Sequence, residues 1–248
     1  MCDRVRKPMP QRAPDRNRPS AIISPSILSA DFAHLARDCN DVLAHGADWL
    51  HVDIMDGHFV PNLTIGHPVV KAIRKHTTAF LDCHLMVSDP AKWVDEFAKA
   101  GADMFTFHIE AFDRDESLAE GAADPRVLAL LARTRELGMR TGIALCPETP
   151  WGALLPYAAE IDMALVMTVR PGFGGQKFMP ETMEKVRALR ELYPDLNIEV
   201  DGGLSTATIE AAAEAGANVI VSGSGVFCVE KPAVAISDMR AAIEAASR

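Results

Sequence analysis

From Ile22 onward, the sequence alternates short apolar runs of strand length with longer segments that have helical spacing and charged faces. The predicted strands are residues 21–28, 49–54, 80–85, 104–109, 141–145, 161–167, 197–200 and 218–221. Strands that alternate with helices form parallel sheets, because each helix carries the chain back to the start of the next strand. This alternation therefore predicts an α/β fold with an eight-stranded parallel sheet.

Proline and glycine mark the boundaries of the repeat. Proline, which is tolerated in the first helical turn, stands at the expected start of six helices: Pro68, Pro90, Pro125, Pro150, Pro180 and Pro232. Glycine, which can end a helix in the left-handed conformation, stands at the expected end of four: Gly46, Gly101, Gly138 and Gly216. Repeats of about 25 to 30 residues fit an eight-fold barrel of about 250 residues, with a doubly wound open sheet as the alternative. We expect one domain over residues 21–248.

The first 20 residues differ from the rest in composition. They hold six basic residues, two acidic ones and four prolines, and almost nothing apolar to bury, which predicts a disordered N-terminal tail. The whole chain has a net charge of −9, and without this tail 19 basic and 32 acidic residues remain, a net charge of −13. Such an acidic body is a poor partner for nucleic acid or an anionic membrane.

The cysteines and the hydropathy indicate the compartment. Five cysteines are scattered without a C-x-x-C pair, which favours a reducing compartment and no disulfide framework. No apolar run is long enough to cross a bilayer, and the N-terminus lacks the apolar region of a secretory signal. We therefore expect a soluble, cytoplasmic protein.

Four polar residues fall at the carboxyl ends of predicted strands, where both candidate folds place their chemistry. His51 and Asp53 share one face of a strand, since side chains alternate with a period of two. His84 and Asp201 stand at two other strand ends. Their nitrogen and oxygen donors suit one divalent ion, Zn²⁺ first, with Fe²⁺, Mn²⁺ or Co²⁺ as alternatives. Other strand ends offer Ser26, His108, Cys146, Met167 and Ser222.

Glycine-rich loops follow the later strands. They are P-G-F-G-G-Q at 171–176, G-G at 202–203 and S-G-S-G at 222–225. Glycine leaves backbone N–H groups free to face an anion, so these loops predict a phosphorylated small-molecule ligand. None of them matches a P-loop or the dinucleotide fingerprint, which argues against nucleotide chemistry.

Five motifs, in this order along the chain, resemble the ribulose-phosphate 3-epimerase family. They are S-P-S-I-L-S-A-D-F at 24–32, H-V-D-I-M-D-G at 51–57, C-H-L-M-V at 83–87, P-G-F-G-G-Q-K-F at 171–178 and V-D-G-G at 200–203. The resemblance implies a (β/α)8 TIM barrel and a homo-oligomer. It also implies interconversion of D-ribulose 5-phosphate and D-xylulose 5-phosphate in the pentose phosphate or reductive pentose phosphate pathway. It also implies metal ligation by His51, Asp53, His84 and Asp201, with Asp53 and Asp201 as the catalytic acid/base pair.

The same resemblance implies the substrate contacts. These are Ser26, Met55, His84, Met86, Met167, Gly172, Phe173, Gly174, Gly175, Gly202, Gly203, Gly223 and Ser224. Inverting a carbon next to a ketone requires proton removal on one face and proton return on the other, so two acid/base groups are needed. We expect one aspartate to be ionised and the other protonated. The three methionines would form a polarisable, water-poor cover over the planar enediolate intermediate.

Three other functions stay open on the sequence alone. One is epimerisation of another phosphorylated ketose, such as allulose 6-phosphate, since pocket length is not visible in the sequence. A second is a lyase such as hexulose-phosphate synthase, which the family pattern places on Asp-x-Lys-x-x-Asp, but Met55 stands where the lysine would be. The third, a non-catalytic phosphate-binding barrel, would require loss of the acid/base pair, and both aspartates are present.

Overall fold

The computed structural model describes residues 19–113, 118–119 and 121–247. All eight predicted strands are present in one parallel sheet with the order β1-β8-β7-β6-β5-β4-β3-β2. The strands are β1 Ile22–Ser24, β2 Trp49–Met55, β3 Phe80–Met86, β4 Met104–His108, β5 Arg140–Leu145, β6 Met163–Met167, β7 Asn197–Asp201 and β8 Val219–Val221. The His51 N–H donates to the Pro25 carbonyl at 3.0 Å, beside a parallel bridge between Ser26 and His51, and so brings β2 back to β1. The sheet therefore forms the predicted barrel, and the open sheet is excluded.

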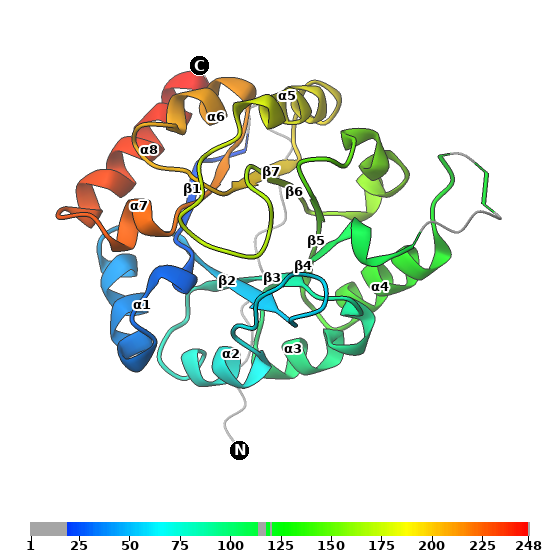
Figure 1. The fold of residues 1–248 in the computed structure, drawn as a ribbon, viewed down its shortest axis with the longest axis horizontal. Coiled ribbons are helices and arrows are strands. Elements are labelled where there is room, and N and C mark those ends of the chain that lie inside the picture. The colour runs from blue at the N-terminus through cyan, green and yellow to red at the C-terminus, as the bar shows by residue number, and fades with distance from the viewer. Residues whose placement is uncertain (1–18, 114–117, 120, 248) are drawn as a thin grey trace.

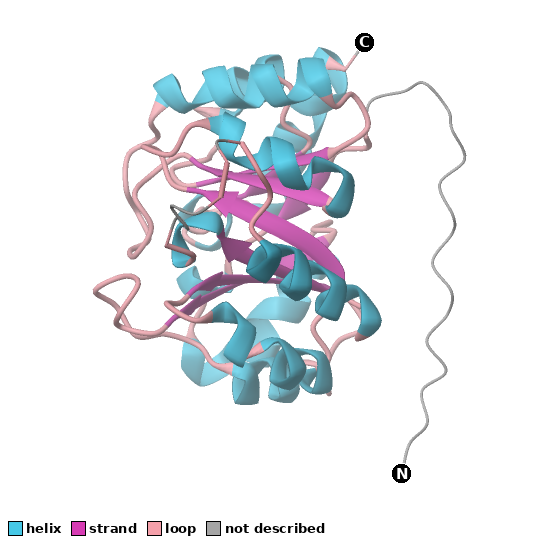
Figure 2. Ribbon diagram, turned by 90° about the vertical axis from the view of Figure 1, so that its right-hand side faces the viewer, coloured by secondary structure: helices cyan, strands magenta, loops and turns pink. Residues whose placement is uncertain are grey.

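Helices surround the ring of strands on all sides (Figures 1 and 2). The α-helices are α1 Leu35–Ala44, α2 His67–Ile73, α3 Val94–Ala100, α4 Pro125–Glu136, α5 Met183–Leu192, α6 Ile209–Ala215, α7 Ser224–Phe227 and α8 Pro232–Ala246. The 3-10 helices are η1 Ile27–Ser29, η2 Phe32–His34, η3 Pro90–Lys92, η4 Ile109–Ala111, η5 Trp151–Glu160 and η6 Pro180–Thr182. The connection between β5 and β6 is the 3-10 helix η5, which contains Pro156. No α-helix lies between these two strands, whose connecting residues are all described.

The predicted boundaries hold at the four glycines. Gly46, Gly101, Gly138 and Gly216 all have positive φ, as the helix ends require. Pro68, Pro125 and Pro232 lie in the first turn of α2, α4 and α8, while Pro90 and Pro180 open the 3-10 turns before α3 and α5. Pro150 stands one residue before η5.

The first predicted strand, residues 21–28, is too long. It ends at Ser24, because Pro25 has no N–H for the sheet and the Ser26 hydroxyl caps η1 by accepting from the Leu28 N–H at 3.3 Å. The predicted tail over residues 1–20 lies outside the described residues except for its last two. In the part of the chain that is described, no helix is long and apolar enough to cross a membrane.

The barrel interior is filled in layers. At the amino-terminal end Trp49, Met104, Met163 and Val219 pack together in one apolar cluster. Polar side chains lie above them, towards the carboxyl ends of the strands, where His51 pairs in register with Asp82 and Asp53 with His84. Cys83 points the other way and is fully buried in the main core between strands and helices, as its position in the strand predicts. The sheet thus gathers its polar groups at one mouth.

Arg190 of α5 ties the opposite end of the barrel together. Arg190 is 6% exposed, and its guanidinium donates to the carbonyls of Gly216 and Leu196 at 2.9 and 2.7 Å and to the Asn218 side chain at 2.9 Å. Arg190→Met should lower the free energy of unfolding by about 3 kcal/mol, because it leaves buried acceptors without a donor. Urea unfolding measures this, with the exposed Arg187→Met on the same helix as the control. A loss below about 1 kcal/mol would contradict this role.

Candidate active site

Four side chains meet at the carboxyl ends of the strands. His51 and Asp53 come from β2, His84 from β3 and Asp201 from β7, and one donor atom of each lies within 4.8 Å of the others. The Asp53 Oδ1 is 3.4 Å from both the His51 Nε2 and the His84 Nδ1. The Asp201 Oδ2 is 3.8 and 3.7 Å from the same two nitrogens. The structure therefore brings together all four residues that were predicted as metal ligands.

The Nδ1 of His51 contacts two further acidic side chains. It lies 2.7 Å from the Asp82 Oδ2 and 3.6 Å from the Glu199 Oε1, and all three side chains are fully buried. This contact directs the Nε2 towards Asp53 and Asp201. Sequence reasoning missed Asp82 and Glu199, although a charged residue inside an apolar strand is a usable indication of a buried polar contact.

The donor set fits a divalent cation. Two imidazole nitrogens and two carboxylate oxygens are ligands that Zn²⁺ and related ions accept. Burial opposes a charge on His51, yet the negative charges of Asp53, Asp82 and Glu199 outweigh burial and raise its pKa. A bound cation would offset the negative charge of the ionised carboxylates among these four donors.

The two aspartates have opposite shifts. Burial would raise the pKa of Asp53, but the His51 charge and hydrogen bonds from His51 and His84 lower it below the ordinary value. Burial and the charge of Asp53 raise the pKa of Asp201 to about 7. The Ser26 hydroxyl also donates a hydrogen bond to the Asp53 Oδ2, which favours the ionised form. The two carboxyl groups therefore differ in their tendency to ionise.

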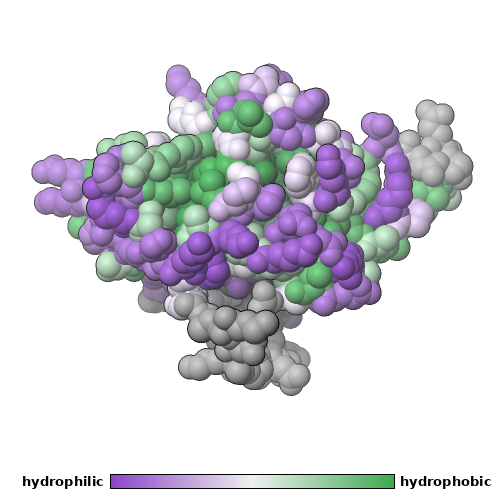
Figure 3. All heavy atoms as spheres, turned by 90° about the horizontal axis from the view of Figure 1, so that it is seen from below, coloured by the Kyte–Doolittle hydropathy of each residue, from purple (hydrophilic) through white to green (hydrophobic). Residues whose placement is uncertain are grey.

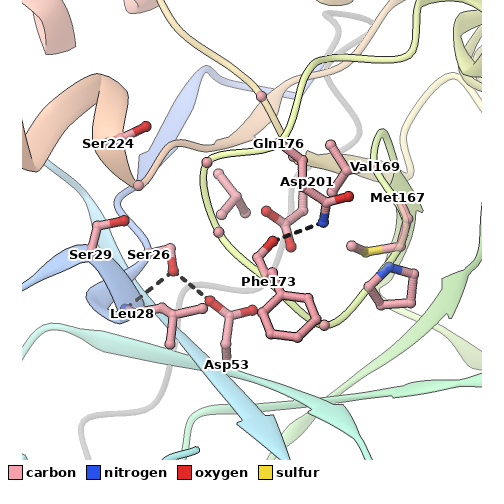
Figure 4. A pocket seen from close by; sticks show the side chains of 18 of the residues that line it. Ser26, Leu28, Ser29, Asp53, Met167, Val169, Phe173, Gln176, Asp201 and Ser224 are labelled. Atoms are coloured by element: carbon pink, nitrogen blue, oxygen red, sulfur yellow. Dashed lines mark hydrogen bonds between the residues drawn. The ribbon is translucent and has the colours of Figure 1, made fainter. Parts of the chain in front are cut away.

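The two carboxyl groups point into one pocket at the barrel mouth (Figure 4). Of the predicted substrate contacts, Ser26, Met55, Met86, Met167, Gly172, Phe173, Gly174, Gly175, Gly202, Gly203, Gly223 and Ser224 line it. His84 lies among the four clustered donors instead. Sequence reasoning did not select Leu28, Ser29, Val169, Pro171, Gln176, Leu204 and Val221, which also line it. Pro171, Gln176 and Leu204 each stand next to a predicted residue and extend the predicted glycine-rich segments.

Gly203 lies close to the backbone of another segment. A Cβ on Gly203, whose φ is +69°, would come within 2.4 Å of the Phe178 N, so only glycine fits there. The 171–176 loop is fixed across the mouth, because the Asn62 side chain donates to the Gly172 carbonyl at 2.8 Å. The Gln176 amide donates to the Phe173 carbonyl at 2.9 Å and closes the loop on itself (Figure 4).

The three predicted methionines are buried at the mouth. Met55 and Met86 pack with Val60, and Met167 packs with Val169 in a neighbouring cluster. All three also line the pocket. The pocket therefore has an apolar, polarisable wall beside its charged groups.

Asp56 organises the loop that follows β2. Its carboxylate accepts from the N–H groups of His58 and Phe59 and from both the N–H and the hydroxyl of Ser88, at 2.8 to 2.9 Å. Partial burial opposes ionisation, but the backbone donors outweigh it and lower the carboxyl pKa from 3.8 to about 2. The carboxylate thus stabilises the fold above pH 3.8, and this contribution is lost as the pH falls through about 2.

We therefore expect Asp56→Ala to lower the free energy of unfolding at pH 7 by about 1 to 3 kcal/mol. The difference from the wild type should shrink as the pH falls from 3.8 towards 2. Urea unfolding at a series of pH values measures both effects, with the exposed Asp41→Ala on α1 as the control. A difference that stays constant down to pH 2 would contradict the role of the ionised carboxylate.

Comparison with known proteins places the chain among sugar-phosphate enzymes. The model of the ribulose-phosphate 3 epimerase family matches residues 22–227. The cytoplasmic isoform of ribulose-phosphate 3-epimerase from Oryza sativa subsp. japonica is 54% identical over 228 residues, which are 91% of this chain and 95% of that protein. Ribulose-phosphate 3-epimerase from Schizosaccharomyces pombe is 52% identical over 223 residues, 89% and 92% of the two chains.

A solved structure confirms the architecture. The 3-hexulose-6-phosphate synthase of Salmonella typhimurium superposes with a TM-score of 0.62 over 91% of this chain and 99% of that one. Its sequence is 17% identical, so this likeness concerns the barrel alone.

Proposed function

The chain belongs to the ribulose-phosphate 3-epimerase family, and from this we propose that it interconverts D-ribulose 5-phosphate and D-xylulose 5-phosphate. It is an isomerase. The observation that carries the proposal further is the pair Asp53 and Asp201, whose carboxyl groups share one pocket and have opposite pKa shifts. Such a pair supplies the base and the acid that inversion at C3 requires.

Each aspartate has a defined part in the proposed reaction. The ionised aspartate removes the C3 proton from one face of the ketose, which leaves an enediolate. The protonated aspartate then returns a proton to C3 from the opposite face, and the configuration is inverted. In the reverse direction the two groups exchange roles. The Ser26 hydroxyl, which donates to Asp53, favours the ionised state of that residue before each forward turnover.

We propose that His51, Asp53, His84 and Asp201 hold one divalent ion, with Zn²⁺ as the first expectation and Fe²⁺, Mn²⁺ or Co²⁺ as alternatives. When bound, the ion would supply positive charge that stabilises the negative oxygens of the enediolate. Met55, Met86 and Met167 line the same pocket. Their apolar side chains would exclude water around the intermediate, which would strengthen the electrostatic interactions there.

The phosphate end of the substrate is assigned to the glycine-rich segments. The pocket lining includes Gly202, Gly203, Gly223 and Ser224 together with residues 172–175. Backbone N–H groups in such segments are suited to phosphate oxygens, and in these barrels the loops after the last two strands often have that role.

An assay with ribulose 5-phosphate, run beside allulose 6-phosphate, tests the substrate. We expect the pentulose phosphate to be turned over with the higher kcat/KM. A higher value for allulose 6-phosphate would assign the chain to a hexulose phosphate, and no turnover of either would favour a non-catalytic barrel. Aldol cleavage, the lyase alternative, would release two fragments that the same assay separates by chromatography.

We also propose a cytoplasmic homo-oligomer. The rice relative is named as a cytoplasmic isoform, which supports the location. The face shown in Figure 3 is hydrophilic around an apolar hollow, and Leu63, 76% exposed in the loop before α2, adds to the apolar surface of the molecule. Apolar surface of this kind is often covered by another subunit. Light scattering after size-exclusion chromatography measures the assembly, and a mass of one chain would contradict it.

A further inference from the structure

The candidate ligand His84 has a second contact that the proposed reaction does not use. Its Nδ1 faces Asp53 and Asp201, while its Nε2 lies 2.9 Å from the Nε2 of His108. His108 ends β4 and is fully buried. Its own Nδ1 lies 3.1 Å from the Oε2 of Glu110, in η4. A continuous line of contacts therefore runs from the four-residue cluster through two imidazoles to a carboxylate.

The proton positions along this line follow from the ligand role of His84. A histidine that binds a metal through Nδ1 in its neutral form must carry its proton on Nε2. That N–H can only donate to the Nε2 of His108, which must then be an unprotonated acceptor. His108 consequently carries its proton on Nδ1 and donates it to Glu110. Each of these ring nitrogens is then either a donor or an acceptor, and the Glu110 carboxylate, which can only accept, fixes the donor role of the His108 Nδ1.

Glu110 is itself held in place. Its Oε1 accepts from the backbone N–H of Cys146 at 2.7 Å, so the carboxylate bridges η4 and the end of β5. Burial opposes its ionisation, but the contacts to His108, Thr149 and the Cys146 N–H lower its pKa to about 2. An ionised acceptor is thus available at the end of the line. It also strengthens the hydrogen bond from His108, because charge-assisted hydrogen bonds are the stronger kind.

We propose that His108 and Glu110 are positioning residues that fix the tautomer and ring orientation of His84 and so raise its strength as a metal ligand. This inference rests on the proposed metal site. It assigns a role to two residues that neither touch the pocket nor belong to the four clustered donors.

A competing assignment is available for the same atoms. His108, Glu110 and Cys146 place one donor each within 4.8 Å, and the Cys146 Sγ lies 3.5 Å from the His108 Nδ1, so these three could hold a second ion. Binding of a second ion requires an unprotonated Nδ1 on His108, whereas the positioning role requires a proton on that nitrogen. The two assignments are therefore exclusive, and burial together with the Glu110 charge raises the pKa of the Cys146 thiol, which disfavours the thiolate ligand.

The experiment measures metal binding, separately from activity. Metal-free full-length wild type, Glu110→Gln and Cys146→Ser are titrated with Zn²⁺ against a chromogenic chelator, and the visible spectra of their Co²⁺ forms are recorded. Glu110→Gln keeps the size of the side chain but removes its charge and one acceptor. Cys146→Ser keeps the backbone N–H that holds Glu110 and is the matched control. If Glu110→Gln does not fold, the alternative variant is His108→Phe, which replaces the imidazole by a ring without nitrogens.

We expect one ion per chain, Zn²⁺ binding about 10- to 100-fold weaker in Glu110→Gln with shifted Co²⁺ bands, and unchanged binding in Cys146→Ser. Unchanged affinity and spectra in Glu110→Gln and His108→Phe would overturn the inference while leaving the four-residue site intact. Two ions per chain, one of them lost in Cys146→Ser, would replace it with the second metal site. A wild type that binds no ion would overturn both the proposed metal site and this inference.

Discussion

Asp201→Asn should abolish epimerisation, lowering kcat by roughly 10²- to 10⁴-fold, the range that one general acid/base group contributes. The substitution preserves shape and keeps an oxygen donor, but asparagine can neither deliver nor accept the proton at C3. Because Asp201 lies at the barrel mouth and is partly exposed, the fold should be retained, which circular dichroism and urea unfolding can check. The exposed Asp41→Asn on α1 is the control and should keep full activity.

A two-base reaction predicts more than loss of turnover. With Asp201 replaced, Asp53 can still remove the C3 proton of whichever ketose presents it on the Asp53 face. That substrate should exchange its C3 proton with deuterated water without being epimerised, whereas the other should not exchange. Asp53→Asn should show the opposite preference. Nuclear magnetic resonance of both substrates with both variants measures this, and exchange of both substrates by either variant would contradict separate bases on opposite faces.

Removal of the metal is the second change with a large expected effect. Dialysis against a chelator should lower kcat at least about 10²-fold, since stabilisation of the enediolate charge by a bound cation is worth several kcal/mol. Stoichiometric Zn²⁺, Fe²⁺, Mn²⁺ or Co²⁺ should restore activity, and the most effective ion would identify the preferred metal. His51→Ala should resemble the metal-free protein and should respond poorly to added ions, because one nitrogen donor is gone.

Calcium is a suitable control in this experiment, because it prefers sites built from oxygen donors and should restore little activity. Metal analysis of the dialysed protein is needed beside the assay. Full activity in protein that holds less than one tenth of an ion per chain, roughly, would contradict the proposed metal role.

Much of the fold was predictable because β/α repeats repeat their boundaries. Proline can begin a helix and glycine can end one for local backbone reasons, so Pro125 and Gly216 mark the same boundaries in the sequence and in the structure. The predicted end of the first strand was wrong for a similar local reason. A short apolar run is ambiguous when Pro25 and a capping Ser26 interrupt it, and only the pairing of β1 with β8 shows where the strand ends.

The four clustered donors were predictable because strand ends meet at one barrel mouth, and the motifs named them one by one. The contacts behind them were not. Asp82 and Glu199 converge on His51 from β3 and β7, and Glu110 reaches His84 only through His108. Each of these contacts depends on strand register and barrel closure. No local pattern fixes which of several buried polar residues will face one another across a barrel.

The role of Met55 was also only partly visible. Its place in the sequence argued against a lyase, where the family pattern has lysine, and in the structure it packs with Met86 and lines the pocket. Methionines inside a strand more often fill a core than cover a ligand, so spacing alone does not separate the two.

The central claim is proton transfer at C3 of ribulose 5-phosphate by Asp53 and Asp201. It is tested most directly by incubating the metal-loaded enzyme with ribulose 5-phosphate in deuterated water and examining the product by nuclear magnetic resonance. The account predicts xylulose 5-phosphate that carries solvent deuterium at C3. Xylulose 5-phosphate that keeps the original proton at C3 in every molecule, or no xylulose 5-phosphate at all, would contradict it.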